Sequence, residues 1–465
     1  MLRFAIFSVL VALSFGACTT GPYDATKDYF PEKASMPLYS TNWKIEYFMN
    51  YKILTVFHGE QQKDETKHVL VQCGTPDPAA SVLEGAERIT IPVSTSASME
   101  STFLGFLDYS GGASGLRGIQ GTDYVAYKKF ADLISGSNSP IVELYNTSDY
   151  TTNFALLREL NTDAIFAGNY DYANLKSNGF SRVFYINELE ESHPLGRAEW
   201  MLAMATLFNA EKTVQQTFND LVSRYKEAVT VVSSVAYRPT VLHGKPYDDG
   251  LYYAPGGRSY MAQYFKDAGA AYAFAADTSV GTFPIPFEQF LAIGKTADIW
   301  AAVDNTNWKS LEDAQKADGG RYADFRSVQC LRAYSRTFNV NGFFDIGTVS
   351  PDKILWDLIK IFHPTFSTRS FVFYNQLISD TQDLPSFCTL PSDQPKSSPP
   401  VLSVGAIVGI AVGGAVFIAL VVALIAYKLG YRRGYYSVPS SPAPHSAAAS
   451  NGFFKTGQTI TTSLV

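Results

Sequence analysis

The 465-residue chain has few of the residues that build metal centres, with 4 cysteines and 6 histidines. No cysteines stand in a Cys-x-x-Cys pair, which argues against zinc and iron–sulfur motifs. The chain also lacks a Gly-x-Ser-x-Gly nucleophile elbow, a His-Glu-x-x-His helix and a phosphate-binding loop. Residues 111–115 are glycine-rich but have neither the spacing nor the lysine of such a loop. We therefore expect a protein that is not an enzyme and that has no intrinsic cofactor or metal.

Basic runs are absent from the long middle part of the chain. The net charge is −6, but both ends are basic and contain no acidic residue. The basic residues there are Arg3, Lys428, Arg432, Arg433 and Lys455. The segment between the ends is therefore more acidic than the whole chain. Because nucleic acids bind to basic surfaces, we expect no nucleic acid partner.

The N-terminus has the pattern of a secretory signal peptide. Residues 1–18 begin with Arg3, continue in an apolar stretch and end in small residues. The apolar stretch is too short to span a bilayer. A second interpretation is a lipoprotein signal, because Cys18 follows Gly16 and Ala17, although Phe15 is unfavourable in such a motif.

A second apolar run, residues 401–427, contains no charged residue and is long enough to cross a membrane as a helix. Basic residues follow it at once, which places the C-terminus in the cytoplasm. A linker rich in Pro and Ser, residues 389–400, precedes it. We expect a single-pass protein of the plasma membrane or the endosomal membrane, with an extracellular N-terminus.

The cytoplasmic tail, residues 428–465, contains two short motifs. Tyr435–Val438 has the form of a tyrosine-based endocytosis signal, and Ser463–Val465 that of a C-terminal PDZ ligand. Both are short enough to occur by chance. If they are used, an endocytic adaptor is a partner.

An extracellular location permits disulfide bonds and glycosylation. Cys330 and Cys388 lie in the same half of the extracellular part and form one candidate pair. Cys73 is then free, or paired with Cys18 if that residue survives processing. Asn146-Thr147-Ser148 is a glycosylation sequon.

Strand and helix patterns alternate along residues 19–388, which predicts an α/β fold with parallel, doubly wound sheets. The predicted elements include strands at 51–57, 68–72, 88–93 and 240–243 and a final helix at 351–362. From residue 197 to 232 the apolar residues recur at helical spacing without Pro or Gly, which predicts one long helix. This helix would bridge an N-terminal lobe, residues 19–196, and a C-terminal lobe, residues 233–388. Ligands of such sheets bind beyond the carboxyl ends of the strands. The predicted loops at these ends are 94–98, 243–258 and 304–308.

Four segments resemble a known family and follow its order. They are DYFP at 28–31 with YK at 51–52, SHPLGRAEW at 192–200, YAPGGRSY at 253–260 with DAGA at 267–270, and PDKIL at 351–355 with DL at 357–358 and HP at 363–364. On these residues the chain resembles the helical-backbone (class III) substrate-binding proteins of importers for ferric siderophores, cobalamin and haem. The resemblance covers most of residues 28–366. It implies two Rossmann-like lobes on one helix and a ligand between them.

The C-terminal anchor departs from the bacterial pattern of this family. In this respect the chain is similar to the membrane-anchored ferrichrome-binding proteins of algae such as diatoms. The resemblance implies a cell-surface receptor that captures a ferric siderophore, preferably a hydroxamate, for iron uptake. The receptor would pass iron to an endocytic route or to a ferric reductase. The alternatives are a cobalamin or haem binding protein and an adhesion or sensing receptor without a ligand.

A ferric siderophore needs aromatic walls and arginine donors for its oxygen atoms. The candidate ligand-binding residues are Tyr252, Tyr253, Arg258, Tyr260, Asn305 and Trp308 in the C-terminal lobe, and Ser98, Met99, Arg117 and Tyr124 in the N-terminal lobe. Each loop also has an ordinary structural explanation: the 252–260 segment as a strand-to-helix turn, and Ser98 as a helix N-cap.

Overall fold

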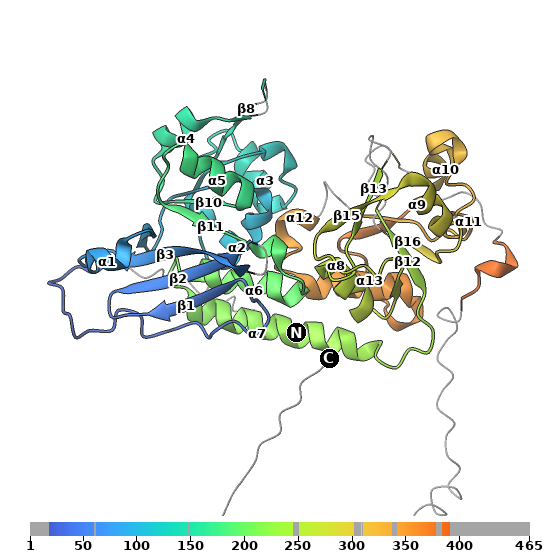
Figure 1. Cartoon of the computed structure of the whole chain (residues 1–465), viewed down its shortest axis with the longest axis horizontal. Helices are drawn as coiled ribbons and strands as arrows, with labels where there is room; N and C mark the ends of the chain where they lie inside the picture. The colour runs from blue at the N-terminus through green and yellow to red at the C-terminus, as the bar shows by residue number, and fades with distance from the viewer. Residues whose placement is uncertain are drawn as a thin grey trace, which may run out of the picture. The chain divides into compact units, whose positions relative to one another are not determined.

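A computed structural model describes residues 18–59, 62–146, 148–149, 151–244, 251–301, 308, 310–336, 342–377 and 384–390 (Figure 1). The predicted signal segment up to residue 17, the membrane helix, the tail and most of the linker lie outside these residues. Within them, every helix is too short or too polar to cross a bilayer. The class is mixed α/β with parallel sheets, as predicted from the alternating pattern.

The chain first forms a four-stranded sheet from β1 (Trp43–Tyr47), β2 (Tyr51–His58), β3 (Asp64–Gln72) and β4 (Glu87–Ile91). The first three strands are antiparallel, and β4 joins β3 in parallel after a connection through α1 (Ala80–Leu83). The predicted strands at 51–57, 68–72 and 88–93 are therefore present but do not belong to a doubly wound sheet. Short reversals between β1, β2 and β3 permit only antiparallel pairing.

The second sheet of the N-terminal lobe is parallel and has the order β11-β10-β5-β6-β7. Its strands are β5 (Ser96–Ser98), β6 (Leu116–Ile119), β7 (Val142–Glu143), β10 (Ala164–Ala167) and β11 (Val183–Tyr185). The helices α2 (Leu104–Tyr109), α3 (Lys128–Ser135), α4 (Phe154–Leu160) and α5 (Asn169–Ser177) connect them, with a small hairpin of β8 (Tyr145–Asn146) and β9 (Thr151–Thr152). The prediction of a loop at 94–98 was wrong, because residues 96–98 form the central strand. Their small side chains are fully buried between β10 and β6.

The predicted single helix over 197–232 was also wrong. The structure has two helices, α6 (Pro194–Ala205) and α7 (Glu211–Val231), which pack against each other. Asn209 adopts a left-handed backbone (φ 53°), and the N–H of Ala210 donates to the carbonyl of Ala205. This is the hydrogen bond of a Schellman C-cap, in which Asn takes the position usually held by Gly. The break falls at residues 206–210, between the two helices.

The C-terminal lobe contains a three-stranded parallel sheet, β14-β12-β16, formed by β12 (Thr240–His243), β14 (Ala271–Tyr272) and β16 (Ile299–Ala301). Antiparallel pairs accompany it: β13 (Leu251–Pro255) with β15 (Thr282–Pro286), and β17 (Tyr334–Arg336) with β18 (Tyr374–Gln376). The helices are α8 (Tyr260–Asp267), α9 (Phe287–Gly294), α10 (Leu311–Gly320), α11 (Arg326–Gln329), α12 (Phe343–Ile346) and α13 (Pro351–Phe362). The predicted helix at 351–362 is present with the same bounds.

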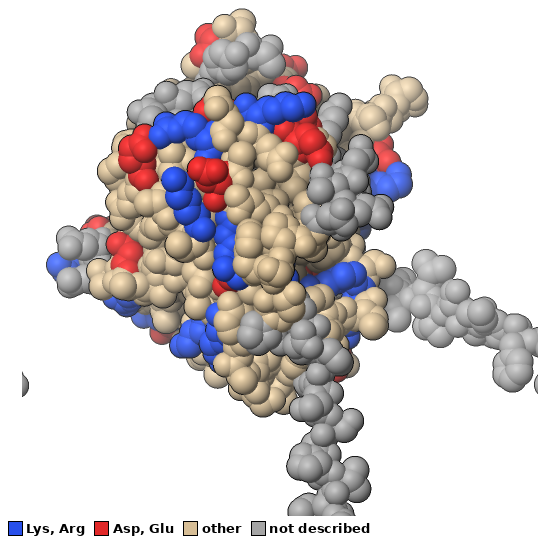
Figure 2. Space-filling view, turned by 90° about the vertical axis from the view of Figure 1, so that its right-hand side faces the viewer, with Lys and Arg blue, Asp and Glu red and all other residues tan. Residues whose placement is uncertain are grey.

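Ion pairs cross the surface of this lobe. Arg321 pairs with Glu288, and Arg326 with Asp298 at 3.1 Å. Figure 2 shows acidic and basic side chains interspersed over this side of the molecule, with uncharged surface between them.

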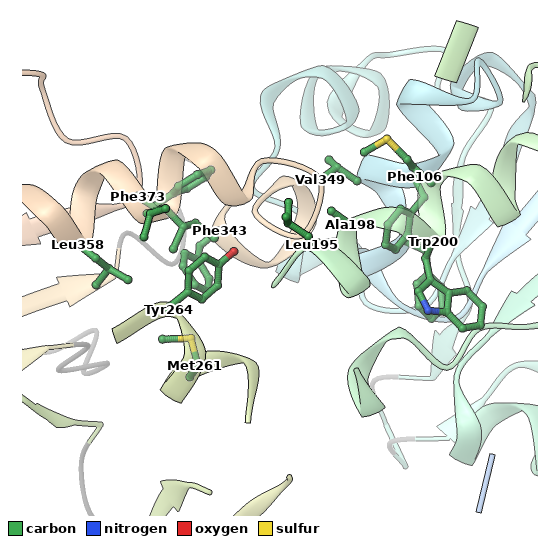
Figure 3. Close-up of a cluster of buried hydrophobic side chains, with 14 of the residues drawn as sticks. Phe106, Leu195, Ala198, Trp200, Met261, Tyr264, Phe343, Val349, Leu358 and Phe373 are labelled. Carbon is green, nitrogen blue, oxygen red and sulfur yellow. The ribbon is translucent and has the colours of Figure 1, made fainter. Parts of the chain in front are cut away.

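One apolar cluster continues from the N-terminal lobe through α6 into the C-terminal lobe. Figure 3 shows Phe106 of α2, Leu195 and Ala198 of α6 and Phe343 of α12 in this cluster. Tyr264 of α8 joins them there (Figure 3). Because such packing resists large opening, the two lobes are joined by more than a flexible linker.

Two disulfides close the ends of the described region. Cys330 bonds to Cys388, the pair considered from the sequence, and Cys18 bonds to Cys73. Cys18, at the end of the predicted signal segment, is therefore part of the folded structure. A thiol in a disulfide is not available for a lipid anchor, so this pairing and the lipoprotein interpretation exclude each other.

Candidate functional site

Three neighbouring parallel strands end at one pocket. Residues directly after β5, β6 and β10 line it or hold its walls, because the carboxyl ends of parallel strands meet at one edge of a sheet. The N–H of Met99 donates to Phe166 O, and that of Gln120 to Ser98 O, which fixes these segments side by side. The pocket has a volume of about 400 Å³. Its lining residues are Met99, Glu100, Ser101, Thr102, Gln120, Gly121, Tyr124, Tyr145, Asp171 and Phe344.

The carboxylate of Glu143 holds the loop that carries Tyr124 through hydrogen bonds to the backbone. Glu143 at the end of β7 accepts hydrogen bonds from Gly121 N (2.8 Å), Thr122 N (2.6 Å) and Tyr145 N (2.6 Å). Gly121 has a left-handed backbone (φ 85°), where a side chain would collide with the Tyr124 ring. Glu143 thus holds both the loop of Tyr124 and the backbone of Tyr145, the two tyrosines that line the pocket.

Two carboxyl groups face the pocket, and among the described residues that line it there is no Lys, Arg or His. Burial raises the pKa of Glu100 to about 7, with a further rise from the nearby carboxylates of Glu188 and Asp171. Burial also raises the pKa of Asp171 to about 6. Glu100 accepts a hydrogen bond from Thr102 Oγ1 at 3.1 Å. The pocket combines negative charge with aromatic walls.

The C-terminal lobe contributes one wall through α12. Phe344 lines the pocket, and its neighbour Asp345 fastens α12 to the N-terminal lobe. The Asp345 carboxylate accepts hydrogen bonds from Ala126 N (2.7 Å) and Tyr127 N (2.8 Å). Burial raises the pKa of this carboxyl group. The pocket is therefore built from both lobes.

A smaller cavity of about 70 Å³ adjoins the pocket, since Thr102 and Phe344 line both. Arg197 of α6 lies here, with its guanidinium 4.1 Å from the ring centroid of Tyr260. Arg197 forms a buried ion pair with Glu188. Arg197 is buried, and its guanidinium already has Glu188 as its ion-pair partner.

The structure distributes the predicted ligand-binding residues over several places. Met99 and Tyr124 line the pocket, and Tyr260 lines the adjoining cavity. Ser98 is buried just behind it, where its hydroxyl donates to Glu100 O at 2.8 Å. Tyr252 is fully buried in the C-terminal lobe, 4.2 Å from the ring centroid of Phe290.

Four of the remaining candidates are described, and they are not among the residues that line this pocket. Arg258 lines a separate pocket of about 490 Å³ with His193 and Lys266. Arg117 donates to the backbone carbonyls of its own turn. The other three lie elsewhere: Tyr253 is 37% exposed on β13, Trp308 packs against Trp300 and Tyr322, and Asn305 lies outside the described residues.

Glu100, Gln120, Tyr145, Asp171 and Phe344 were missed from the sequence. Glu100 and Asp171 follow strands β5 and β10, and the position after a buried strand was the signal that could have found them. Phe344 had no such signal, because only the packing of the two lobes brings it to the pocket.

Two further features concern modification and metals. Asn146, the predicted glycosylation site, is exposed at the end of β8, next to the pocket residue Tyr145. Within the described residues, no three His, Cys, Asp or Glu side chains are grouped as a metal site.

Comparison with known proteins finds a family model that matches part of the chain. Residues 179–319 match the family model described as periplasmic binding protein. The matched segment begins two residues after the end of α5, continues through β11, α6, α7, β12, α8 and β16, and ends in α10. The match therefore covers the end of the N-terminal lobe, the two bridging helices and the first part of the C-terminal lobe.

Individual relatives are distant. An uncharacterised lipoprotein of Methanocaldococcus jannaschii is 24% identical over 366 residues, which are 72% of this chain and 85% of the relative. Three solved structures are similar at TM-scores below 0.5. They are a possible iron-binding (periplasmic solute-binding) protein of Staphylococcus epidermidis (15% identity, TM-score 0.44, 58% of this chain and 98% of that chain), the vitamin B12 binding protein BtuF of Vibrio cholerae (14%, 0.43, 58% and 96%) and a haem-binding protein of Pseudomonas aeruginosa (14%, 0.47, 62% and 100%).

Proposed function

We propose that this chain is a cell-surface substrate-binding receptor that captures a ferric siderophore of the hydroxamate type for iron uptake. The observation that carries the proposal is the pocket at the ends of β5, β6 and β10, which both lobes line. A pocket of this size with tyrosine and phenylalanine walls is of the kind that binds small organic ligands. The match to the periplasmic binding proteins supports capture rather than catalysis.

The charge of the pocket favours hydroxamates over other ligand classes. Glu100 and Asp171 line the pocket, and the part of its lining that the structure describes contains no basic residue. Tricatecholate iron complexes and the propionates of haem carry negative charge, which these carboxylates repel. Ferric trihydroxamates are neutral or positively charged, so they avoid this repulsion. The arginine donors expected from the sequence are replaced here by acidic and aromatic groups.

The proposed receptor is held at the plasma or endosomal membrane by the predicted helix at 401–427, with residues 18–388 outside the cytoplasm. Disulfides at both ends of the described region fit an oxidising location. The algal form of the receptor, delivery to a ferric reductase and uptake through an endocytic adaptor belong to the same proposal.

Ligand titration tests the function. The full chain in detergent is titrated with ferrichrome, ferric enterobactin, cyanocobalamin and haemin, and binding is followed by tryptophan fluorescence and calorimetry. We expect micromolar or tighter affinity for ferrichrome and weaker binding of the other three. Preference for haemin or cobalamin would replace the siderophore with that ligand, and binding of none would defeat the uptake function.

A matched pair of variants locates the site. Tyr124→Ala removes an aromatic wall of the pocket, whereas Tyr253→Ala removes an exposed tyrosine of the C-terminal lobe that does not line it. We expect the first variant to weaken ferrichrome binding about tenfold and the second to leave it unchanged. Equal effects would place the ligand elsewhere.

A further inference from the structure

The two carboxyl groups that line the pocket, Glu100 and Asp171, form no ion pair within the described residues. Glu100 follows β5, Asp171 lies on α5, and Glu188 lies on the short helix 188–190. Arg197 lines the adjoining cavity and is paired with Glu188. Lys176, on the same helix α5 as Asp171, is paired with Glu87. Glu100 and Asp171 are thus left without a basic partner in this part of the chain.

Neutral hydrogen-bond donors hold the two carboxyl groups in place. Glu100 accepts from Thr102 Oγ1 and from the N–H of Gly168, whose lack of a side chain lets the carboxylate approach the backbone. Asp171 is 92% buried and accepts from the side chain of Gln120. On the side of α12, the Asp345 carboxylate is engaged by Ala126, Tyr127 and Ser101. Donors of this kind orient a carboxylate without neutralising it.

Three aromatic side chains, Tyr124, Tyr145 and Phe344, line the pocket beside these carboxyl groups. The guanidinium of Arg336 already lies over the ring of Phe344, 5.1 Å from its centroid, so the attraction for a ligand falls to the two carboxylates and the two tyrosines. Acidic and aromatic groups together attract an organic cation, because both the carboxylates and the ring faces are negative. The carboxylates would repel an anionic ligand, and the negative ring faces would not attract it.

We propose that this pocket selects a siderophore that carries a protonated amino group, and that acidification of the surroundings weakens its binding. The inference rests on the proposed function and adds the charge class of the ligand. A cation is bound best when Glu100 and Asp171 are ionised. The raised pKa values of about 7 and about 6 place the loss of their charge between pH 8 and pH 5. An amino group keeps its proton throughout this range.

The test uses two probes that share one iron chelate. Ferrioxamine B carries a terminal ammonium group, and its N-acetylated form is neutral. Both are titrated against the full chain in detergent at pH 8 and pH 5 by tryptophan fluorescence. At pH 8 we expect the cationic probe to bind about tenfold more tightly. At pH 5 we expect this preference to fall to about twofold or less.

Variants assign the effect to the two carboxyl groups. Glu100→Gln and Asp171→Asn should each reduce the preference at pH 8 while leaving the affinity for the neutral probe within about threefold. Glu159→Gln, an exposed acid of α4 in the same lobe, is the control and should keep the preference. If a variant does not fold, the wild-type comparison of the two probes at two pH values decides by itself.

The outcomes separate the two proposals. Equal binding of both probes at both pH values overturns the charge selection and leaves the siderophore function standing. A preference that persists at pH 5, or in both variants, also overturns it. Binding of neither probe, together with no binding of ferrichrome, defeats the siderophore function and this inference with it.

Discussion

The strongest stability prediction concerns Lys52, a fully buried lysine of β2. Its ammonium group donates to Thr206 O and Asn209 Oδ1, each at 2.8 Å, and pairs with Glu211. All three partners lie at the break between α6 and α7. Lys52 therefore ties the reversal of the two bridging helices to the first sheet.

Replacing Lys52 with Met keeps most of the side-chain volume but removes the charge. Glu211, with its side chain 3% exposed, would then remain buried without its cation. Breaking one partner of a buried ion pair costs about 3–5 kcal/mol, a large share of the 5–15 kcal/mol that usually stabilises a domain. We expect a loss of this size in the free energy of unfolding, measured by urea denaturation of residues 18–390.

Two comparisons make the test specific. Lys67→Met removes the same side chain from β3, where the lysine and its partner Glu65 are both about half exposed, and little change is expected. The double variant Lys52→Met with Glu211→Leu removes both charges and should recover part of the loss. A single Lys52→Met variant that unfolds at the wild-type urea concentration would refute this reasoning.

Three further predictions follow from the same contacts. Because Asp345 joins the lobes through two backbone N–H groups, Asp345→Ala should cost about 2–3 kcal/mol in urea unfolding, and a loss below about 0.5 kcal/mol would contradict this role. The Cys330–Cys388 disulfide, with a sequence separation of 58, should contribute about 4 kcal/mol, so Cys330→Ala with Cys388→Ala should lower the urea midpoint, and an unchanged midpoint would argue against the bond. Burial raises the pKa of Glu100 from 4.5 to about 7 and that of Asp171 from 3.8 to about 6, so their contribution to stability is complete below about pH 4 and is lost as the pH rises through 6 to 7. The ligand-free protein should accordingly unfold at a higher temperature at pH 5 than at pH 8. This difference between the two unfolding temperatures should be smaller in Glu100→Gln. An equal difference in the wild type and the variant would exclude Glu100 as its source.

The segments that resembled a family have mainly structural roles in the described residues. Glu199, from the 192–200 segment, is buried and accepts hydrogen bonds from the backbone N–H groups of Leu38, Tyr39 and Ser40 at 2.7–2.8 Å. Asp357, from the 351–358 segment, accepts from Val372, Phe373 and Tyr374. A family signal of this kind predicts the scaffold well, because a buried carboxylate with several donors tolerates few replacements. It is a poor guide to the ligand.

Local patterns were sufficient for the α/β class and for elements such as β12 and α13, because the periodicity of buried side chains is written in consecutive residues. Local patterns did not predict the break that divides the expected single helix into α6 and α7. Asn209 adopts its left-handed conformation with partners from β2 and β3, and those partners are distant in sequence.

The pocket shows the same division. The sequence by itself predicted ligand contacts after the strands of the N-terminal lobe, at residues that include Met99 and Tyr124, and both of these line the pocket. Only the tertiary structure brought the carboxyl groups of Glu100 and Asp171 close enough to interact, without a basic partner in the described region. It also brought Phe344 of the other lobe to the pocket, where it forms part of the wall. Strand order and lobe packing set which loop ends meet, and both depend on contacts between residues far apart in the chain.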